Sequence, residues 1–147
     1  MKKGLFNLLA LSILCSCGAQ IPDNLAGDIQ FAYLTVPDEV LYDFGTRAVN
    51  TSTDKSFTVV NQGGRVATSV TGHFGFSAYS FKGGTFPGIG GTCSTVIQSA
   101  EQCVVVITFA PTYPGTFNEF LQLSYFNGAN IDTTTSPILK ARAVAGP

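Results

Sequence analysis

The stretch QCVVVITFAP, residues 102–111, is the clearest strand in the sequence. Val, Ile, Thr and Phe dominate it, and these β-branched and aromatic types favour extended backbone. Side chains on a strand alternate between its two faces, so every second residue shares one face: Cys103, Val105, Ile107 and Phe109. Pro111 has no N–H group and cannot continue a hydrogen-bonded ladder. The stretch therefore predicts a strand over residues 102–109.

From about Gln30 onward the chain repeats this pattern, in short runs rich in Val, Ile, Thr, Phe and Tyr that Gly, Pro and Asn separate. Such runs are typical of strands, and no helical periodicity is sustained along them. The predicted strands cover residues 31–36, 41–44, 56–61, 66–72, 76–82, 102–109, 116–126 and 136–144. About seven antiparallel strands at this spacing indicate an all-β sandwich.

The final predicted strand has the clearest alternation of apolar and polar side chains. Leu139, Ala141 and Ala143 alternate with Lys140 and Arg142. This period of two predicts that one face packs on the core and the other meets water.

The N-terminus has the composition of a secretory signal. Lys2 and Lys3 precede residues 5–14, which are apolar except for Asn7 and Ser12. A membrane-spanning helix needs about 20 apolar residues, and this run is about half that length. A basic start followed by a short apolar run is typical of a signal peptide that is removed on export.

The next segment, Leu14-Cys15-Ser16-Cys17, resembles the bacterial lipobox, in which an aliphatic residue and two mostly small residues precede the cysteine that receives the lipid. Cleavage is expected after the small Ser16, with Cys17 lipidated. Cys15 is a poorer acceptor because bulky Leu14 would then precede the cut. The alternative is an ordinary secretory signal with two incidental thiols, although no good small-x-small site lies nearby. The predicted organisation is a signal peptide over 1–16, a lipidated tether over 17–28 and one domain over 29–147.

This N-terminus predicts a bacterial cell-envelope protein that is anchored to the membrane through its lipid. Gly18, rather than Asp, follows the lipidated cysteine. That choice is compatible with the outer membrane, on its periplasmic or surface side, if the bacterium is Gram-negative.

The charge of the mature chain excludes one class of partner. Removal of Lys2 and Lys3 with residues 1–16 leaves six basic residues against nine acidic ones, a formal charge of −3. The six are scattered, whereas nucleic-acid binding needs clustered Lys and Arg. Nucleic acid is therefore not an expected partner.

Two of the four cysteines belong to the domain. With Cys15 removed and Cys17 acylated, Cys93 and Cys103 form the remaining pair, and in an oxidising compartment such a pair is expected as a disulfide. The alternative is two buried free thiols. A metal site is disfavoured because His73 is the only histidine and no second cysteine pair exists.

An ordered series of motifs extends over roughly residues 38 to 145. It reads DFGT (43–46), SFTVVNQG (56–63), TC (92–93), CVVVITFAP (103–111), PGTF (114–117) and LKARA (139–143). The series resembles the Hydin-like (ASH) immunoglobulin-like domains, including those of the bacterial choice-of-anchor D type. The resemblance implies a seven-stranded immunoglobulin-like sandwich, related to the major-sperm-protein and pilus-chaperone type. Members commonly occur as repeats in long surface or periplasmic proteins, whereas this chain carries a single copy.

The sequence offers no catalytic group that stands out. His73 lies in Thr71-Gly72-His73-Phe74-Gly75, which fits neither a nucleophile elbow nor a metal pair. The nine acids are spread along the chain, and the glycine-rich residues 83–91 lack the Lys-Ser/Thr of a phosphate loop. We expect no catalytic residue, no cofactor and no metal.

The loop over residues 82–92 is the one unusual segment. It carries Phe86, Pro87 and Ile89 on a glycine-rich backbone that Cys93 ties down. The functional hypothesis is a binding loop at one end of the sandwich. The simpler interpretation is a loop whose Phe86 and Ile89 cap the core.

The sequence thus predicts a non-catalytic, lipid-anchored envelope protein that acts as a binding or structural module. The expected partners are the membrane, through the N-terminal lipid, and a protein or envelope polymer. One alternative is a periplasmic chaperone-like factor that works by strand addition, which rests on analogy of fold. A small envelope hydrolase is the other.

Overall fold

The computed structural model describes residues 30–75 and 78–146. The predicted signal peptide, the lipidation site Cys17 and the tether over 17–28 lie outside these residues. Within the described ranges, no helix is long and apolar enough to cross a membrane.

The described chain is all-β, as the sequence predicts, and contains short strands joined by turns. The strands are β1 (Leu34–Thr35), β2 (Leu41–Ala48), β3 (Thr53–Asn61), β4 (Ala67–His73), β5 (Tyr79–Phe81), β6 (Val96–Ile97), β7 (Gln102–Phe109), β8 (Gly115–Glu119), β9 (Gln122–Phe126), β10 (Ile131–Thr135) and β11 (Ile138–Val144). The predicted strand over 102–109 has the bounds of β7.

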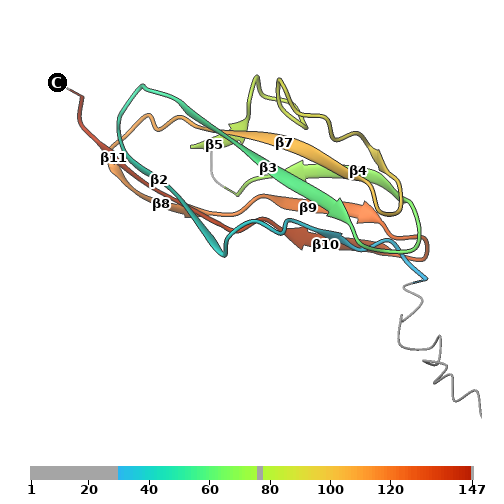
Figure 1. Ribbon diagram of the computed structural model, residues 1–147. Coiled ribbons are helices and arrows are strands. Elements are labelled where there is room, and N and C mark those ends of the chain that lie inside the picture. The colour runs from blue at the N-terminus through green and yellow to red at the C-terminus, as the bar shows by residue number, and fades with distance from the viewer. Residues whose placement is uncertain (1–29, 76–77, 147) are drawn as a thin grey trace, which may run out of the picture.

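The strands form three sheets, which have the orders β1-β3-β7-β5, β10-β9-β4-β6 and β2-β11-β8. Figure 1 shows β2, β8 and β11 together toward one end of the domain, and β4, β9 and β10 toward the other. β8 runs on into β9, so the chain passes from one of these two sheets into the other. The first described residues and the C-terminus lie at opposite ends of the domain (Figure 1).

One strand pair departs from the expected antiparallel arrangement. β2 runs parallel to β11, whereas β8 pairs with the other side of β11 in the antiparallel sense. The register of β2 shifts within the motif Asp43-Phe44-Gly45, so that Phe44 and Gly45 both stand opposite Ala141. Gly45 has φ of +76°, a backbone conformation that glycine adopts without the steric cost of a side chain. The glycine of the DFGT motif therefore makes this bulge possible.

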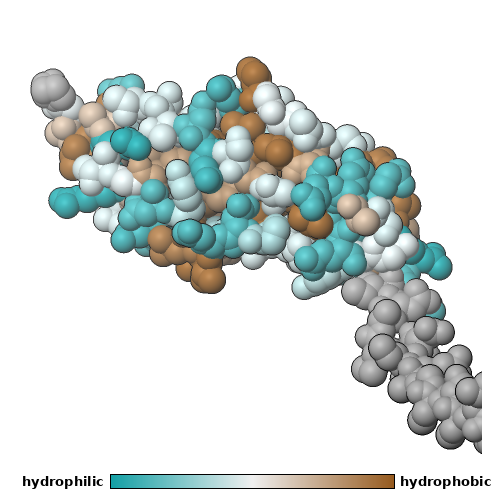
Figure 2. Space-filling model, viewed as in Figure 1, coloured by the Kyte–Doolittle hydropathy of each residue, from teal (hydrophilic) through white to brown (hydrophobic). Residues whose placement is uncertain are grey.

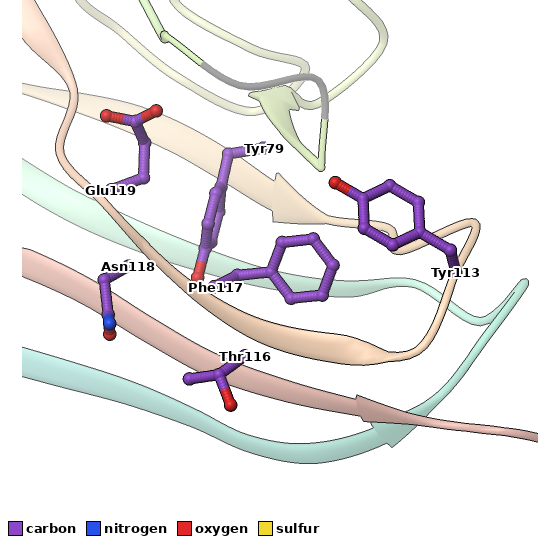
Figure 3. Close-up of a pocket in the computed structure, with 6 residues that line it drawn as sticks. All are labelled: Tyr79, Tyr113, Thr116, Phe117, Asn118 and Glu119. Atoms are coloured by element: carbon purple, nitrogen blue, oxygen red, sulfur yellow. The ribbon is translucent and has the colours of Figure 1, made fainter.

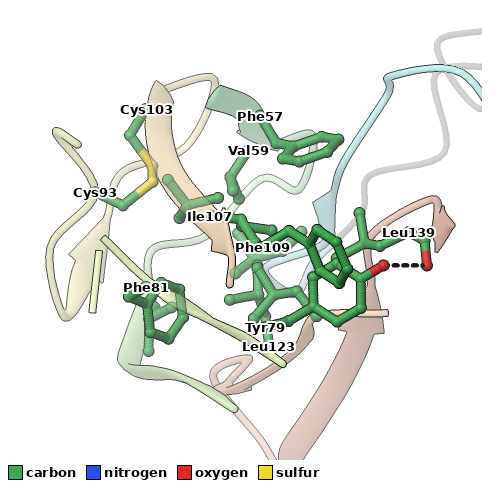
Figure 4. Close-up of a cluster of buried hydrophobic side chains, with 14 of the residues drawn as sticks. Phe57, Val59, Tyr79, Phe81, Cys93, Cys103, Ile107, Phe109, Leu123 and Leu139 are labelled. Atoms are coloured by element: carbon green, nitrogen blue, oxygen red, sulfur yellow. Dashed lines mark hydrogen bonds between the residues drawn. A yellow bond between two sulfur atoms is a disulfide. The ribbon is translucent and has the colours of Figure 1, made fainter. Parts of the chain in front are cut away.

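Aromatic side chains link the sheets in the core. Phe109 of β7 is fully buried and has ring centroids 5.9 Å from Phe44, 5.0 Å from Tyr79 and 5.4 Å from Phe117. These rings come from β2, β5 and β8, and Figure 4 shows the cluster with the hydroxyl of Tyr79 bonded to the carbonyl of Leu139, at 3.1 Å. The alternating faces predicted for β7 and β11 are confirmed as buried: Cys103, Val105, Ile107, Phe109, Leu139, Ala141 and Ala143. Leu121, Leu123 and Tyr125, at and along β9, are buried with them.

A buried amide fastens the end at which the described chain begins. Asn61 is fully buried, and its Oδ1 accepts the N–H groups of Tyr33 and Gly63, at 3.1 and 3.0 Å. Its Nδ2 donates to the carbonyls of Arg65 and Ile97, at 2.8 and 3.1 Å. One side chain thereby joins the entry of the chain, the β3–β4 turn and β6.

The sequence predicts one strand over residues 116–126, and the structure divides it at Phe120 and Leu121 into β8 and β9. The reason is a change of partner. β8 pairs with β11, β9 pairs with β4 and β10, and the N–H of Leu121 donates to the hydroxyl of Ser136 between them. The apolar alternation continues through this point and conceals the break.

Other strand bounds also differ from the prediction. β10 and β6 were not expected, because β10 carries Asp and Thr residues after one isoleucine and β6 is only two residues long. β5 covers Tyr79–Phe81 of the predicted 76–82, of which 76 and 77 lie outside the described residues. β1 covers only Leu34–Thr35 of the predicted 31–36, and β2 continues past 41–44 to Ala48. The bulge at Gly45 explains the last difference, since glycine there bends the strand without ending it.

Candidate functional site

The loop over residues 82–92 is fastened along β7. The N–H of Lys82 donates to the carbonyl of Val106, and the N–H of Val106 donates to the carbonyl of Pro87, at 2.9 and 2.8 Å. Gly88 packs so closely here that a Cβ would lie 2.4 Å from the carbonyl oxygen of Val106. The glycines therefore allow close packing against β7, which differs from the low local order expected of a flexible binding loop.

The three residues of the predicted binding loop occupy two different environments. Phe86 is half-buried, and its ring centroid lies 5.3 Å from that of Phe81 in an edge-to-face contact. Pro87 is also half-buried and follows a cis peptide bond. Ile89 is 70% exposed. Phe86 therefore caps the core, as the simpler interpretation expects, and Ile89 alone is available to a partner.

Alanine at these two positions should have different effects. Phe86→Ala should lower the free energy of unfolding by about 1.5–3 kcal/mol, because a half-buried ring contributes less stability than a fully buried one. Ile89→Ala should change it by less than about 0.5 kcal/mol, since surface substitutions away from special features are nearly neutral. Chemical denaturation of both variants measures the difference. A similar loss from Ile89→Ala would show that the loop depends on both side chains.

The predicted disulfide is present. Cys93 and Cys103 are bonded with their Cα atoms 4.8 Å apart, and both are buried. Cys103 is the second residue of β7, and Cys93 follows the loop over residues 82–92. The bridge thus holds the end of that loop against the start of β7, as Figure 4 shows.

The side of the sandwich between β5 and β8 carries a hollow of about 290 Å³. Its lining combines three aromatic residues with three polar ones: Tyr79, Tyr113, Phe117, Thr116, Asn118 and Glu119. Figure 3 shows Phe117 directed toward Tyr113, with Tyr79 between Phe117 and Glu119; the centroids of Phe117 and Tyr113 are 5.3 Å apart. Tyr113 is 55% exposed, so the mouth of the hollow is accessible.

Glu119 is the unusual residue of this hollow. It is 8% exposed, and its Oε1 accepts the N–H of Phe120 at 3.0 Å. Its Oε2 is buried without a hydrogen-bond partner among the residues described. A buried carboxylate oxygen without a partner is costly, so it is an acceptor ready for an incoming donor.

Tyr79 is held protonated beside this carboxylate. Burial raises the pKa of the Tyr79 hydroxyl well above its usual range, with smaller contributions from the carboxylates of Asp43 and Glu119. Its hydroxyl donates a hydrogen bond to the carbonyl of Leu139.

Prediction from sequence missed Tyr79, Tyr113 and Glu119. A signal for Glu119 exists: in the run over residues 116–126 the acid shares a face with Phe117, Leu121, Leu123 and Tyr125, and all of these are buried. An acid on an otherwise apolar strand face indicates either a partner or a special role. Tyr113 lies on a turn beside Pro114-Gly115, where nothing in the pattern distinguishes it.

A separate apolar patch lies on the outer face of the sheet β2-β11-β8. Leu41 of β2 stands beside Ile138 of β11, and Val40 and Phe120 adjoin them. These side chains are 42, 45, 85 and 46% exposed. Figure 2 shows a hydrophobic group at the lower edge of the domain, where β2 begins in the view of Figure 1.

His73, the only histidine, lies away from the hollow and the disulfide. His73 ends β4 on an exposed face, and its Nε2 lies 2.7 Å from Oε1 of Gln122. In the described part of the chain, no group of three His, Cys, Asp or Glu side chains is placed to hold a metal ion.

Solved structures of other proteins superpose on this chain, whereas its sequence has no match among protein families. No protein-family model matches the chain, and no curated protein matches its sequence. The ASH/PapD-like domain 7 of human CEP192 superposes with a TM-score of 0.51 at 16% identity, over 79% of this chain and 87% of that one. The VesB protease of Vibrio cholerae gives 0.55 at 14% identity, over 81% of this chain. A family 123 glycoside hydrolase from Clostridium perfringens gives 0.51 at 10% identity, over 82% of this chain.

The extent of these matches differs. This chain spans about a third of the VesB protease, 33%, and 26% of the glycoside hydrolase, whereas it spans most of the CEP192 domain. All the identities are low, so the matches concern the fold. The described domain has an immunoglobulin-like, all-β sandwich fold.

Proposed function

We propose that this chain is a non-catalytic, lipid-anchored binding module of a bacterial envelope, and that it receives an extended segment of a partner protein along β8. The observation that carries the proposal is the hollow of Tyr79, Tyr113 and Phe117 directly beside the free edge of β8. In the sheet β2-β11-β8, within the described residues, β11 is the only strand that pairs with β8. Alternate backbone groups of an antiparallel edge strand point away from its neighbour, so β8 offers donors and acceptors to an added strand.

Glu119 supports a partner of particular chemistry. A charge that points inward from an edge strand discourages an apolar strand from pairing there. The same carboxylate, with an oxygen that lacks a partner among residues 30–75 and 78–146, would accept a hydrogen bond from a lysine or arginine at roughly twice the strength of a neutral pair. A cation there would also meet the rings of Tyr79 and Phe117, which favour it further. The proposed partner segment is therefore extended and carries a basic side chain.

The lipid anchor rests on the sequence. The run of Lys2 and Lys3, the short apolar stretch and Leu14-Cys15-Ser16-Cys17 support export and lipidation at Cys17. The motif series that resembles choice-of-anchor D domains supports a place in the envelope. A chaperone-like factor is the second candidate, because strand addition at β8 is the same contact. A chaperone-like factor would differ from a binding module because it would release its partner after the partner has folded.

Photo-cross-linking in the bacterium that carries the chain tests the binding site. Tyr113→p-benzoylphenylalanine places a reactive ring at the mouth of the hollow. Ile89→p-benzoylphenylalanine is the control, since Ile89 is more exposed, at 70% against 55%, and lies on the loop over residues 82–92. Irradiation should give an adduct from position 113 that mass spectrometry maps to one segment of one protein, and no such adduct from position 89.

A second substitution tests the role of the carboxylate. Glu119→Gln keeps the size of the side chain and removes its charge. Loss of a charge-assisted hydrogen bond of about 1.5–3 kcal/mol should weaken the adduct about tenfold or more. Equal adducts from positions 113 and 89, or an adduct at 113 that Glu119→Gln leaves unchanged, would contradict the proposed mode of binding.

A further inference from the structure

An apolar row crosses the outer face of the sheet β10-β9-β4-β6. Ile131 stands opposite Phe126, Phe126 opposite Thr68, and Thr68 opposite Val96, so the four residues follow one another across all four strands. Ile131, Phe126 and Val96 are 69, 38 and 39% exposed. We call these four residues the tether-end row. Val66, two residues before Thr68 and also exposed, extends it.

The paired positions of the face that carries the tether-end row hold no Asp, Glu, Lys or Arg. Arg65, which precedes Val66, packs beside Gly128 at the border of the row. The next paired positions along the same face are polar: Thr71, His73, Gln122, Ser124, Thr133 and Thr135. The other sheets differ, since ion pairs join Asp43 to Lys140 and Asp54 to Lys82 there. This face can therefore approach an apolar surface without removing a charge from water, which would be costly.

The described chain enters the domain at this row. The N–H of Ala32 donates to the carbonyl of Asn127 at 2.8 Å, and Asn127 directly follows Phe126 at the turn that leads to Ile131. Phe31 and Tyr33 flank this contact and are 46 and 49% exposed. Six of the large exposed apolar side chains thus gather at the end where the chain enters: Phe31, Tyr33, Val66, Val96, Phe126 and Ile131.

We propose that the tether-end row, with Phe31 and Tyr33, is a membrane-contact surface, and that its occupant is the bilayer into which the lipid of Cys17 inserts. This inference rests on the lipid anchor of the proposed function. Twelve residues lie between Cys17 and Gln30, and a chain of that length reaches at most about 45 Å when fully extended. The row is therefore always within reach of the bilayer surface.

The chemistry of the row fits the interfacial region of a bilayer. Aromatic rings favour the level of the lipid headgroups, and aliphatic side chains favour the boundary with the acyl chains. Because the paired positions of the face carry no acid, lysine or arginine and Arg65 alone borders the row, the contact should depend little on anionic lipid or on salt. The row is small, but a tether supplies a high effective concentration of membrane, so even a weak contact is populated.

The contact would set the orientation of the domain. The C-terminus lies at the end opposite the first described residues (Figure 1). Tyr113 lies between β7 and β8, and Asn50 of the neighbouring β2–β3 turn donates its N–H to the carbonyl of Pro111 at 2.8 Å, which places the connection over residues 110–114 at that far end. The hollow at Tyr113 would then face away from the bilayer and stay open to a partner.

Single tryptophans in the full lipidated chain test the surface, because the natural chain contains none. Ile131→Trp places the probe in the tether-end row. Ile89→Trp is a matched control, since the two isoleucines are 69 and 70% exposed but lie far apart on the domain. Both proteins are reconstituted into vesicles of phosphatidylethanolamine and phosphatidylglycerol, with and without brominated acyl chains, and into vesicles of phosphatidylcholine alone.

Emission from Ile131→Trp should shift to shorter wavelength in every vesicle and should be lost with brominated lipid, while Ile89→Trp should change in neither respect. Added salt and omission of phosphatidylglycerol should leave the result unchanged. Melting curves of both variants confirm that each one is folded.

Three results would overturn the inference. Quenching at both positions, or at neither, would mean that the row has no preferred contact with lipid. A blue shift at position 131 without quenching, which grows with protein density, would mean that a second copy of the chain covers the row. Failure of the anchor itself is seen separately: a mature protein without diacylglyceryl mass, or one that does not float with vesicles, contradicts lipidation at Cys17, for which Cys17→Ser is the reference.

Discussion

Replacement of Asn61 with alanine should lower the free energy of unfolding by about 3–5 kcal/mol, a large part of the stability of a domain of this size. The amide makes four hydrogen bonds, to Tyr33, Gly63, Arg65 and Ile97. Alanine would leave two N–H groups and two carbonyls without their partner. The N–H of Gly63 and the carbonyl of Ile97 are the most deeply buried of these groups, so water would not replace the lost amide. Each buried group left without a hydrogen bond costs about 1–3 kcal/mol.

Urea denaturation of Asn61→Ala and of the natural chain measures this loss. Asn118→Ala is the control, because Asn118 is an exposed asparagine on β8. It should change the free energy of unfolding by less than about 0.5 kcal/mol. Asn61→Asp should also destabilise the domain, since a carboxylate would face the carbonyls of Arg65 and Ile97. A loss below about 1 kcal/mol in Asn61→Ala would mean that the four bonds contribute little net stability.

Removal of the disulfide should lower the free energy of unfolding by about 2.7 kcal/mol, as the chain-entropy relation gives for a loop of this length. The cysteines are separated by ten residues, and without the bridge the unfolded chain gains the freedom of that loop. The double change Cys93→Ala and Cys103→Ala avoids a new free thiol. Since both side chains are buried, some packing is lost as well.

Thermal unfolding of the double variant should show a melting temperature lower by roughly 10 °C. Reduction of the natural protein should give nearly the same midpoint, because both treatments remove the same constraint. Alkylation of the folded, unreduced protein should label neither Cys93 nor Cys103. Labelling of both, or a double variant as stable as the natural chain, would show that the bridge does not form or does not constrain the unfolded chain.

The sequence predicts the core better than the connections. β7 is predicted because β-branched and aromatic residues dominate it, and β11 because its apolar and polar residues alternate; each has one wholly buried side, as at Phe109 and Leu139. β10 is missed because it lies at the edge of its sheet and none of its side chains is buried. Alternation reports burial, so an edge strand that buries little has little pattern to detect.

The candidate site illustrates a second limit. The loop over residues 82–92 attracts attention through its glycines, yet those glycines serve close packing on β7, and Phe86 caps the core. The hollow at Tyr79, Tyr113 and Glu119 comes from two separate segments, β5 and residues 113–119, that meet only when β5 and β8 are placed side by side. Local sequence does not show which segments come together, and its one signal for this site is Glu119, an acid on an apolar strand face.

The parallel pairing of β2 with β11 has a consequence for the order in which the domain can fold. Leu41 pairs with Ile138, so the first long strand must wait for the last one to emerge from the ribosome. β8 waits as well, because β11 lies between the two. Contacts between such distant segments form slowly and leave strand edges exposed in the meantime. The half of the domain built on β2, β8 and β11 is therefore completed last, and a newly made chain would be most prone to aggregate during that interval.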